Sequence, residues 1–245
     1  MTMEIICDFD GTVARPDTVD ELLEALADPA WRGIEERWRR GEIDSRACMA
    51  RQIPLLRGGW TAIARFLDER VTVHPSFAPF AAWCAGRGIA LRIASEGIDR
   101  VIHHLLAREH IAVSSVWASR LAVGTDGTLS LDFSHASGRT YCGAALCKCE
   151  TFRPSPFRAS PMRPIRVLIG DGRSDYCAAS RADVVFARAM LLDHCRAEQI
   201  RCIPFESFDT VRTVVEHSLT SASERAPIRA AASGSRRQLA ETHES

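Results

Sequence analysis

Two pairs of acidic residues lie at the ends of apolar runs, where a reactive site could form. Asp8 and Asp10 are two positions apart and close the first run, and Asp171 and Asp175 follow a later run over residues 165–169. Carboxylate oxygens are the ligands that Mg²⁺ prefers, and a carboxyl group can also act as a general acid or base. Either pair alone is equally typical of a turn or a solvated strand edge, so function can be inferred only from the residues that accompany them.

A single lysine lies between the two acidic pairs. The 31 basic residues of the chain are 30 arginines and one lysine, Lys148. Arginine offers a planar fork of donors, whereas lysine is a compact point charge. Retention of one lysine in an arginine-rich chain indicates a position that needs a compact ammonium group, unless it is an accident of composition.

Strands that alternate with helices must position these groups. Apolar runs bounded by turn residues predict strands at residues 4–9, 89–94, 165–169, 184–187 and 202–204. Residues 116–133 are typical of a β-hairpin around Thr125-Asp126-Gly127. The alternation predicts an α/β fold with a parallel sheet, in which sites form beyond the carboxyl ends of the strands. Ser95 follows the second strand, in a position where serine often caps a helix.

Residues 15–76 are predicted to be a helical block without strands. Apolar residues recur at helical spacing from Val19 to Leu26, and Asp17 or Thr18 is placed to cap that helix. Residues 219–245 are rich in alanine, serine and arginine and lack apolar periodicity, which predicts disorder. The expected division is therefore a core of residues 1–14 and 77–218, a helical cap of residues 15–76 and a disordered tail of residues 219–245.

Composition narrows the classes of protein that this chain can belong to. It has 245 residues, 46% hydrophobic and 25% charged, with zero net charge, as an ordinary soluble protein has. The balance of charge gives no long-range attraction to nucleic acid or an anionic membrane, and no apolar run approaches the roughly 20 residues of a membrane span. The first residues lack a secretory layout, and nine cysteines then indicate reduced thiols. We expect a cytoplasmic monomer or homodimer whose partner is a small molecule.

The ordered set of these residues resembles the haloacid dehalogenase superfamily. The likeness rests on four segments in the usual order of that superfamily, namely Asp8-Phe9-Asp10-Gly11-Thr12-Val13, Ser95, Lys148 and Gly170-Asp171-Gly172-Arg173-Ser174-Asp175. The resemblance implies a Rossmann-like parallel sheet. The insert after the first segment resembles the cap of the phosphoserine-phosphatase-like branch. Within it, the chain is similar to the methionine-salvage phosphatases that act on 2-hydroxy-3-keto-5-methylthiopentenyl-1-phosphate, through Asp17, the cysteines near Lys148, and residues 182–188.

The resemblance implies Mg²⁺-dependent hydrolysis of a small phosphate monoester through an aspartyl-phosphate. Asp8 would be the nucleophile, Asp10 the general acid and then base, and Lys148 the cation that neutralises Asp8 and the phosphate. Asp8 and Asp171 would ligate Mg²⁺ through carboxylates and Asp10 through its carbonyl group. Dehalogenases of the superfamily lack the second aspartate of the first segment, so Asp10 favours a phosphatase.

Further residues acquire supporting roles from the same resemblance. Ser95, with the N–H groups of Glu96 and Gly97, and Lys148 would hold the phosphoryl oxygens, near a helix N-terminus that favours anions. Thr12 would support Asp10, and Asp175 would orient the metal ligands from the second layer.

The cap should choose the substrate, because the core chemistry is generic. Asp17 falls where this branch carries an acidic residue that faces the substrate. Gln52 falls where phosphoserine phosphatases use an arginine to grip a carboxylate, which argues against phosphoserine, although phosphoserine or a related small phosphomonoester stays the alternative. Transfer of the phosphoryl group to an acceptor other than water also stays open. A catalytically idle regulator that binds a phosphorylated ligand would be expected to lack Asp8, Asp10 or Lys148.

Other reactive side chains have plainer interpretations. Cys142, Cys147 and Cys149 are spaced C-x₄-C-x-C; they are interpreted as free thiols, or as a zinc site with His135 as a possible fourth ligand. Cys7 is expected in the core and His103-His104 on the surface. Trp31, Trp38 and Trp60 are expected to pack the cap, where one of them could line the substrate cleft.

Overall fold

Strand alternation in the sequence yields the expected α/β architecture. A computed structural model describes residues 2–133, 144–152 and 164–219. Its main sheet has the order β6-β5-β4-β1-β7-β8-β9, and every neighbouring pair is parallel except β5 and β6. The strands are β1 (Met3–Cys7), β4 (Ala90–Ile98), β5 (Ser115–Val123), β6 (Leu129–Asp132), β7 (Ile165–Gly170), β8 (Val184–Ala187) and β9 (Ile203–Pro204). The predicted fold class and the hairpin are confirmed.

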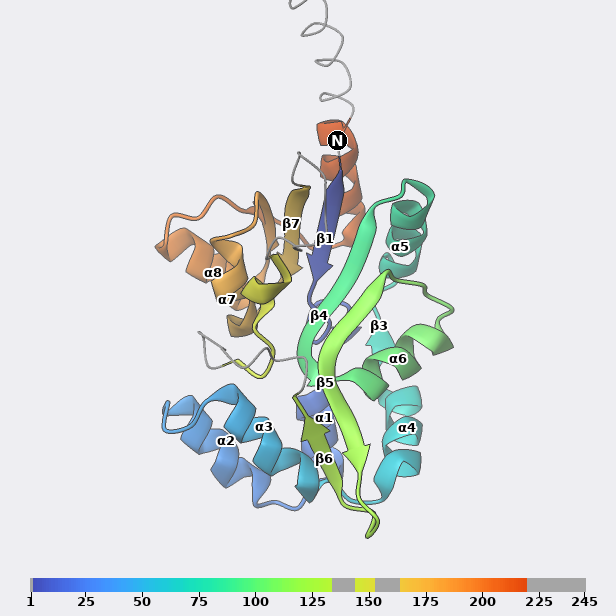
Figure 1. The fold of residues 1–245 in the computed structure, drawn as a ribbon, viewed down its shortest axis with the longest axis vertical. Coiled ribbons are helices and arrows are strands. Elements are labelled where there is room, and N and C mark those ends of the chain that lie inside the picture. The colour runs from blue at the N-terminus through green and yellow to red at the C-terminus, as the bar shows by residue number, and fades with distance from the viewer. Residues whose placement is uncertain (1, 134–143, 153–163, 220–245) are drawn as a thin grey trace, which may run out of the picture.

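Helices cover both faces of this sheet (Figure 1). One side carries α5 (Phe77–Gly86) and α6 (Asp99–Arg108), and the other carries α7 (Tyr176–Ala179) and α8 (Ala189–Ala197). A further helix over residues 208–219 was not predicted from the sequence, and it reaches the first position of the expected tail. The rest of that tail, residues 220–245, lies outside the described residues.

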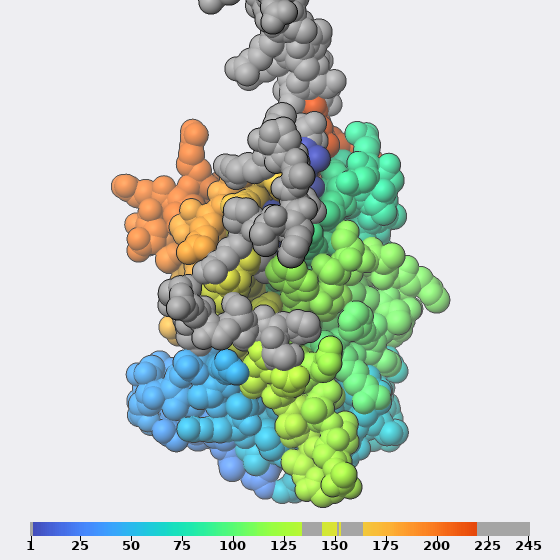
Figure 2. Space-filling model, in the orientation of Figure 1, coloured from blue at the N-terminus to red at the C-terminus, as the bar shows by residue number. Residues whose placement is uncertain are grey.

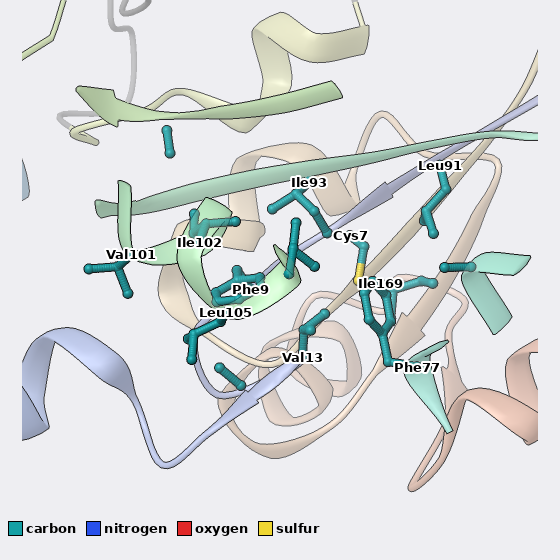
Figure 3. Close-up of a cluster of buried hydrophobic side chains, with 14 of the residues drawn as sticks. Cys7, Phe9, Val13, Phe77, Leu91, Ile93, Val101, Ile102, Leu105 and Ile169 are labelled. Carbon is teal, nitrogen blue, oxygen red and sulfur yellow. The ribbon is translucent and has the colours of Figure 1, made fainter. Parts of the chain in front are cut away.

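The central strand β1 is buried on both faces, which explains its uninterrupted apolar run. Ile5 and Cys7 belong to the cluster under α5 and α6, whereas Ile6 belongs to the cluster under α7 and α8. Figure 3 shows Cys7 beside Ile169 and Phe77 in the first cluster. Burial of each isoleucine or phenylalanine side chain stabilises the folded state by about 1.5–3 kcal/mol. The residues that follow β1 are therefore attached to a tightly packed strand.

The helical insert begins and ends in a small sheet that the sequence did not reveal. It holds α1 (Thr18–Leu26), α2 (Trp31–Arg39), α3 (Ser45–Gln52), η1 (Ile53–Leu55) and α4 (Gly59–Arg70). At its two ends β2 (Ala14–Arg15) pairs with β3 (Thr72–Val73) in antiparallel register. The expectation of a block without strands was therefore wrong, because strands of two residues are too short to show an alternating pattern.

Contacts with the core hold the insert over the carboxyl ends of the strands. Arg108 of α6 donates hydrogen bonds to the carbonyl oxygens of Leu67 and Val71 at 3.0 and 2.9 Å. On the other side, α3 and η1 lie against β6, and Figure 2 shows the insert and the β5–β6 hairpin side by side at the lower end of the molecule. Within the described residues, none of the helices is both long and apolar enough to cross a bilayer.

Candidate active site

The topology of the sheet brings residues of three strands together. Because β4 and β7 flank β1, residues at the same level of these strands must be neighbours. Cys7 pairs with Ile93 of β4 on one side and Ile169 of β7 on the other. Asp8 and Asp171 follow the ends of β1 and β7. Ser95, predicted to follow a strand that ends at residue 94, instead lies within β4, at the irregularity in pairing between Ala94 and Ile98. All three line one cavity.

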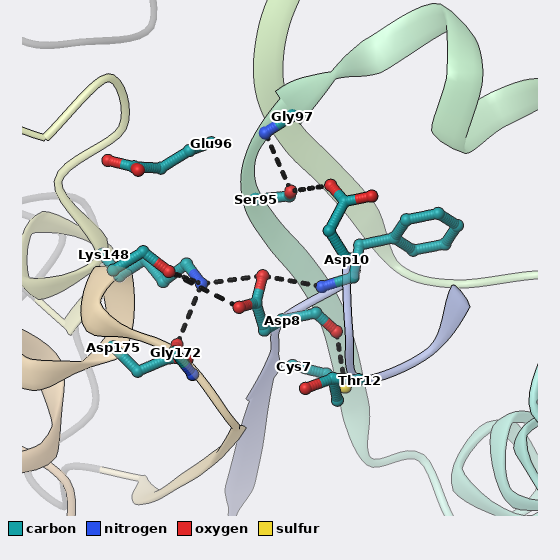
Figure 4. A network of polar contacts seen from close by, with 12 residues as sticks. Cys7, Asp8, Asp10, Thr12, Ser95, Glu96, Gly97, Lys148, Gly172 and Asp175 are labelled. Carbon is teal, nitrogen blue, oxygen red and sulfur yellow. Dashed lines mark hydrogen bonds and ion pairs between the residues drawn. The ribbon is translucent and has the colours of Figure 1, made fainter. Parts of the chain in front are cut away.

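Lys148 lies at the centre of this group although it comes from a segment outside the sheet. Its side chain has no exposed surface, and its Nζ lies 2.7 Å from Asp8 Oδ1, 2.9 Å from Asp175 Oδ1 and 2.9 Å from Ser174 Oγ (Figure 4). Burial opposes the charged ammonium, but the carboxylates of Asp175 and Asp8 outweigh it and raise the pKa of Lys148. The lysine is therefore a permanent cation beside Asp8 at neutral pH.

Three carboxylates share this space. Oxygen atoms of Asp8, Asp171 and Asp175 lie within 4.8 Å of one another. Burial and the neighbouring Asp8 raise the pKa of Asp171 to about 6. Gly11 has a φ of +70° and allows close approach of the first loop, because a Cβ there would collide with the Asp171 carboxylate. Such a crowded set of hard oxygen donors, with one ammonium nearby, fits a divalent cation such as Mg²⁺.

Asp10 lies in a separate part of the same site. Its Oδ1 accepts hydrogen bonds from the Thr18 hydroxyl at 2.5 Å and the Thr18 backbone N–H at 3.1 Å, and its Oδ2 accepts one from Ser95 Oγ at 3.1 Å. Burial raises the pKa of Asp10 despite these bonds. Thr12 was expected to support Asp10, but its hydroxyl donates to Asp171 at 2.7 Å. That expectation was wrong, and Thr18, the first residue of α1, takes the place beside Asp10.

The irregular part of β4 that follows Ser95 differs in detail from the sequence-based expectation. The Gly97 N–H, expected to hold a phosphoryl oxygen, donates to Ser95 Oγ at 2.9 Å. Gly97 also makes room for the acid, because a Cβ there would collide with Asp10 Oδ2. The Glu96 side chain, for which no role was predicted, accepts from Ser45 Oγ and the Ala145 N–H, both at 2.8 Å. Glu96 thus joins the insert, the sheet and the segment that leads to Lys148.

We expect Glu96→Ala to lower the free energy of unfolding by about 1–3 kcal/mol, because Ser45 and the Ala145 N–H would lose their acceptor in a buried place. Glu96→Gln keeps an acceptor and should change stability much less. Denaturant unfolding followed by circular dichroism would measure both, with the exposed Glu206→Ala as control. Equal stability of Glu96→Ala and wild type would show that this junction contributes nothing.

The same variants test a dependence on pH. Burial raises the pKa of Glu96, so the ionised carboxylate costs the folded state free energy at neutral pH. That cost is relieved as the pH falls through the folded pKa towards the ordinary value of about 4.3. The stability of Glu96→Gln relative to wild type should therefore be greatest near pH 7 and shrink as the solution is acidified.

A cavity of about 510 Å³ connects the charged cluster with the insert. From the insert it is lined by Asp17, Val19, Asp20, Glu35, Trp38, Arg39, Ser45, Cys48, Met49 and Gln52. Asp17 also caps α1, since its Oδ1 accepts from the N–H groups of Val19 and Asp20 at 2.9 and 3.1 Å. Gln52 is buried and donates to Glu35 at 3.1 Å. Of the three cap tryptophans named from the sequence, Trp38 lines the cavity.

The remaining reactive side chains divide into three groups. His104 hydrogen-bonds Asp68 at 2.8 Å on the outside of the molecule, in keeping with a surface role. Cys142 and His135 lie outside the described residues, so the zinc site predicted from the sequence spacing stays untested. Sequence reasoning missed the contacts of Thr18 with Asp10 and of Ser174 with Lys148. The sequence indicates Thr18 only as a helix cap and Ser174 only as part of the fourth segment, because no local pattern shows which distant side chain a hydroxyl group will contact.

Comparisons with known proteins agree with this geometry. Residues 5–180 match the family model of the haloacid dehalogenase-like hydrolases. Proteins named 2-hydroxy-3-keto-5-methylthiopentenyl-1-phosphate phosphatase are 29% identical in Exiguobacterium sp., covering 85% of this chain and 94% of the relative, and 29% identical in Brevibacillus brevis, covering 86% and 92%. A solved phospho-aspartyl intermediate analogue of phosphoserine phosphatase superposes with a TM-score of 0.57 at 16% identity, covering 88% of this chain and 98% of that one. At that identity the likeness concerns the fold alone.

Proposed function

Because the chain belongs to the haloacid dehalogenase-like hydrolases, we propose that this phosphoric monoester hydrolase acts on 2-hydroxy-3-keto-5-methylthiopentenyl-1-phosphate. The names of its relatives suggest this substrate. The observation that carries the proposal is the cavity that runs from Asp8, Asp10 and Ser95 to a wall containing Val19, Trp38 and Met49. That wall suits an apolar methylthio tail, while the phosphate meets Asp8, whose carboxylate is paired with the buried Lys148.

In the first half-reaction Asp8 attacks the phosphorus. A carboxylate oxygen of Asp8 forms a bond to phosphorus while the bond from phosphorus to the substrate oxygen breaks. Asp10 donates its proton to that departing oxygen, a role favoured by the raised pKa of Asp10. Lys148, 2.7 Å from Asp8 Oδ1, offsets the repulsion between the carboxylate and the dianionic ester.

In the second half-reaction water releases phosphate. Asp10, now ionised, takes a proton from the water, whose oxygen bonds to phosphorus as the bond to Asp8 breaks. Inorganic phosphate leaves and Asp10 is protonated again, so the cycle closes without any other reagent. Residues 15–76 act in this proposal as a cap that excludes bulk water until the aspartyl-phosphate has formed.

Mg²⁺ would be held by the carboxylates of Asp8 and Asp171 and the carbonyl oxygen of Asp10. When bound, it supplies positive charge to the phosphoryl oxygens. Thr12 fixes Asp171 by its hydrogen bond of 2.7 Å. Asp175 accepts hydrogen bonds from the N–H groups of Asp171 and Gly172, both at 3.2 Å, and so shapes the loop that presents Asp171.

Ser95 and the N–H groups of Glu96 and Gly97 would receive the phosphoryl oxygens in this proposal. Since the Gly97 N–H and Ser95 Oγ are bonded to each other before substrate arrives, both would have to exchange partners. On the opposite side, Gln52 is neutral and engaged with Glu35. Gln52 offers no positive charge to a carboxylate such as that of phosphoserine. Of the two arginines that line the cavity, Arg39 is paired with Glu35 and Arg173 lies over the Trp38 ring, which favours a neutral substrate tail.

Thr18→Val should shift the alkaline limb of the pH–rate profile to higher pH. The Thr18 hydroxyl stabilises the ionised form of Asp10 and so lowers its pKa; valine has a similar shape but no donor. A general acid must be protonated, so activity falls as pH rises through its pKa, and a higher pKa moves that fall upward. Profiles of kcat/KM for wild type, Thr18→Val and the exposed Thr213→Val would test this. An unmoved limb in Thr18→Val would remove Asp10 as the titrating acid.

Substrate choice is tested by phosphate release from four esters, p-nitrophenyl phosphate among them, with Mg²⁺ present. We expect kcat/KM for 2-hydroxy-3-keto-5-methylthiopentenyl-1-phosphate to exceed that for an analogue without the methylthio group by about 10–200-fold, the range for a small apolar group, and to exceed that for L-phosphoserine by more. Equal values would reject the methylthio assignment but leave a phosphatase. Ligand binding without phosphate release from any ester, p-nitrophenyl phosphate included, would indicate a regulator.

A further inference from the structure

Three cysteine side chains converge next to the segment that carries Lys148. Cys147 and Cys149 flank Lys148 in the chain, and Cys177 comes from α7. Their Sγ atoms all lie within 4.8 Å of one another. Cys147 and Cys149 are 3% and 2% exposed. We propose that these three thiols form a binding site for a thiophilic divalent cation, Zn²⁺, distinct from the carboxylate site that faces the substrate.

The spacing of the sulfur atoms suits one ion. Zinc–sulfur bonds of about 2.3 Å in a tetrahedron place ligand sulfurs about 3.8 Å apart, inside the observed limit of 4.8 Å. Cys147 Sγ and Cys149 Sγ are 2.8 Å apart and would separate by about 1 Å to reach that spacing. The same 2.8 Å is too long for a disulfide bond of about 2.05 Å, so Cys147 and Cys149 are thiols that do not form a disulfide with each other.

The softness of the ligands separates this site from the magnesium site. Thiolates select zinc and other soft cations, whereas carboxylates and carbonyl oxygens suit magnesium. Burial raises the pKa of Cys149 to about 12, so without metal it is a neutral and unreactive thiol. Binding of one Zn²⁺ by three thiols would release three protons, and affinity should fall in acid.

An ion could reach the cluster from solvent. Cys177 lines a second hollow of about 330 Å³, which also borders Trp38, Ser45 and Arg173. With three protein ligands, the fourth position of a tetrahedral zinc would be open to water from that hollow.

Zinc at this place would join two segments that position the catalytic residues. Cys147 and Cys149 bracket Lys148, and Cys177 follows Asp175 by two positions. Leu146 and Phe152 from one segment already pack with Ala178 from the other. A metal clamp would strengthen that contact and so hold the Lys148 ammonium 2.9 Å from Asp175.

Cobalt substitution of the full chain tests the proposal. The protein is stripped with a chelator, kept reduced, and titrated with Co²⁺ in excess Mg²⁺; only sulfur ligands give the intense thiolate-to-cobalt charge-transfer band in the near ultraviolet. We expect the band to saturate at about one equivalent and Zn²⁺ to abolish it. Cys177→Ser and Cys147→Ser each remove a direct ligand, so each should weaken metal affinity by more than the roughly 10–100-fold that loss of an outer-shell partner costs. The matched control is Cys202→Ser. Cys202 is hydrogen-bonded to Cys195, and among the described residues this pair belongs to no group of three metal-binding side chains.

Each outcome decides the proposal. Loss of the band in both cluster variants, with the band intact in Cys202→Ser, supports it. Folded, reduced wild type without the band would overturn it, as would a band that survives in both cluster variants. A Cys147–Cys149 disulfide found by mass spectrometry in protein purified under reducing conditions would overturn it too. None of these readouts requires phosphatase activity, so the result does not depend on the proposed function.

Discussion

Asp8→Asn is expected to reduce turnover of every phosphate ester by at least about 10⁴-fold, the scale seen when a nucleophile is removed. The amide cannot form the bond to phosphorus that the carboxylate forms. Its oxygen can still accept from the Phe9 N–H and from Lys148, which both lie 2.7 Å from Asp8 Oδ1. The variant should therefore fold normally and fail at the chemical step. Hydrolysis of p-nitrophenyl phosphate with Mg²⁺ measures the loss.

The covalent intermediate provides the second readout for this variant. Wild type quenched in acid during turnover should contain a fraction of chains heavier by one phosphoryl group, and Asp8→Asn should contain none. Asp68 is an exposed aspartate that pairs with His104, and Asp68→Asn is the control for replacing an aspartate by asparagine. Undiminished turnover by Asp8→Asn, with circular dichroism unchanged, would remove Asp8 as nucleophile and with it the aspartyl-phosphate mechanism.

The part of this site that the sequence predicted is the part that local patterns encode. The strand before Asp8 is apolar because β1 is covered on both faces, and the strand before Asp171 follows the same rule. Once both are strands of one parallel sheet, their carboxyl ends share an edge. Lys148 was singled out by composition, and its contact with Asp8 agrees with the need for a compact cation. These inferences need only chain-local signals and one rule of topology.

What the sequence could not predict depends on contacts between distant segments. Thr12 and Thr18 are both hydroxyl residues close to Asp10, and only the path of the chain into α1 decides which one contacts it. The β2–β3 pair joins residues more than fifty positions apart and leaves no periodic trace. Cys177 sits in a short helix 28 positions beyond Cys149, so its approach to that thiol follows from the packing of η2 (Lys148–Phe152) against α7.

Lys148→Arg is expected to lower kcat by about 100-fold or more, although the charge is retained. The Lys148 nitrogen donates to one oxygen each of Asp8, Asp175 and Ser174, at 2.7–2.9 Å. A guanidinium spreads its donors over a plane and cannot address the same three oxygens from a side chain with no exposed surface. Loss of one preorganised electrostatic contact commonly costs 10²–10³ in kcat, and the larger group would also strain the packing by about 1–3 kcal/mol.

The test of Lys148→Arg must separate misplaced charge from general damage. Kinetics on p-nitrophenyl phosphate and on a metabolite ester should show the same fractional fall in kcat, because the lysine serves the phosphoryl group common to both. Arg32→Lys, at an exposed ion pair with Glu24, is the matched exchange in the opposite direction and should leave kcat unchanged. If Lys148→Arg retained nearly full kcat, a point charge would not be required at this position. The single lysine of the chain would then be a compositional accident, because an arginine at the same position would neutralise Asp8 equally well.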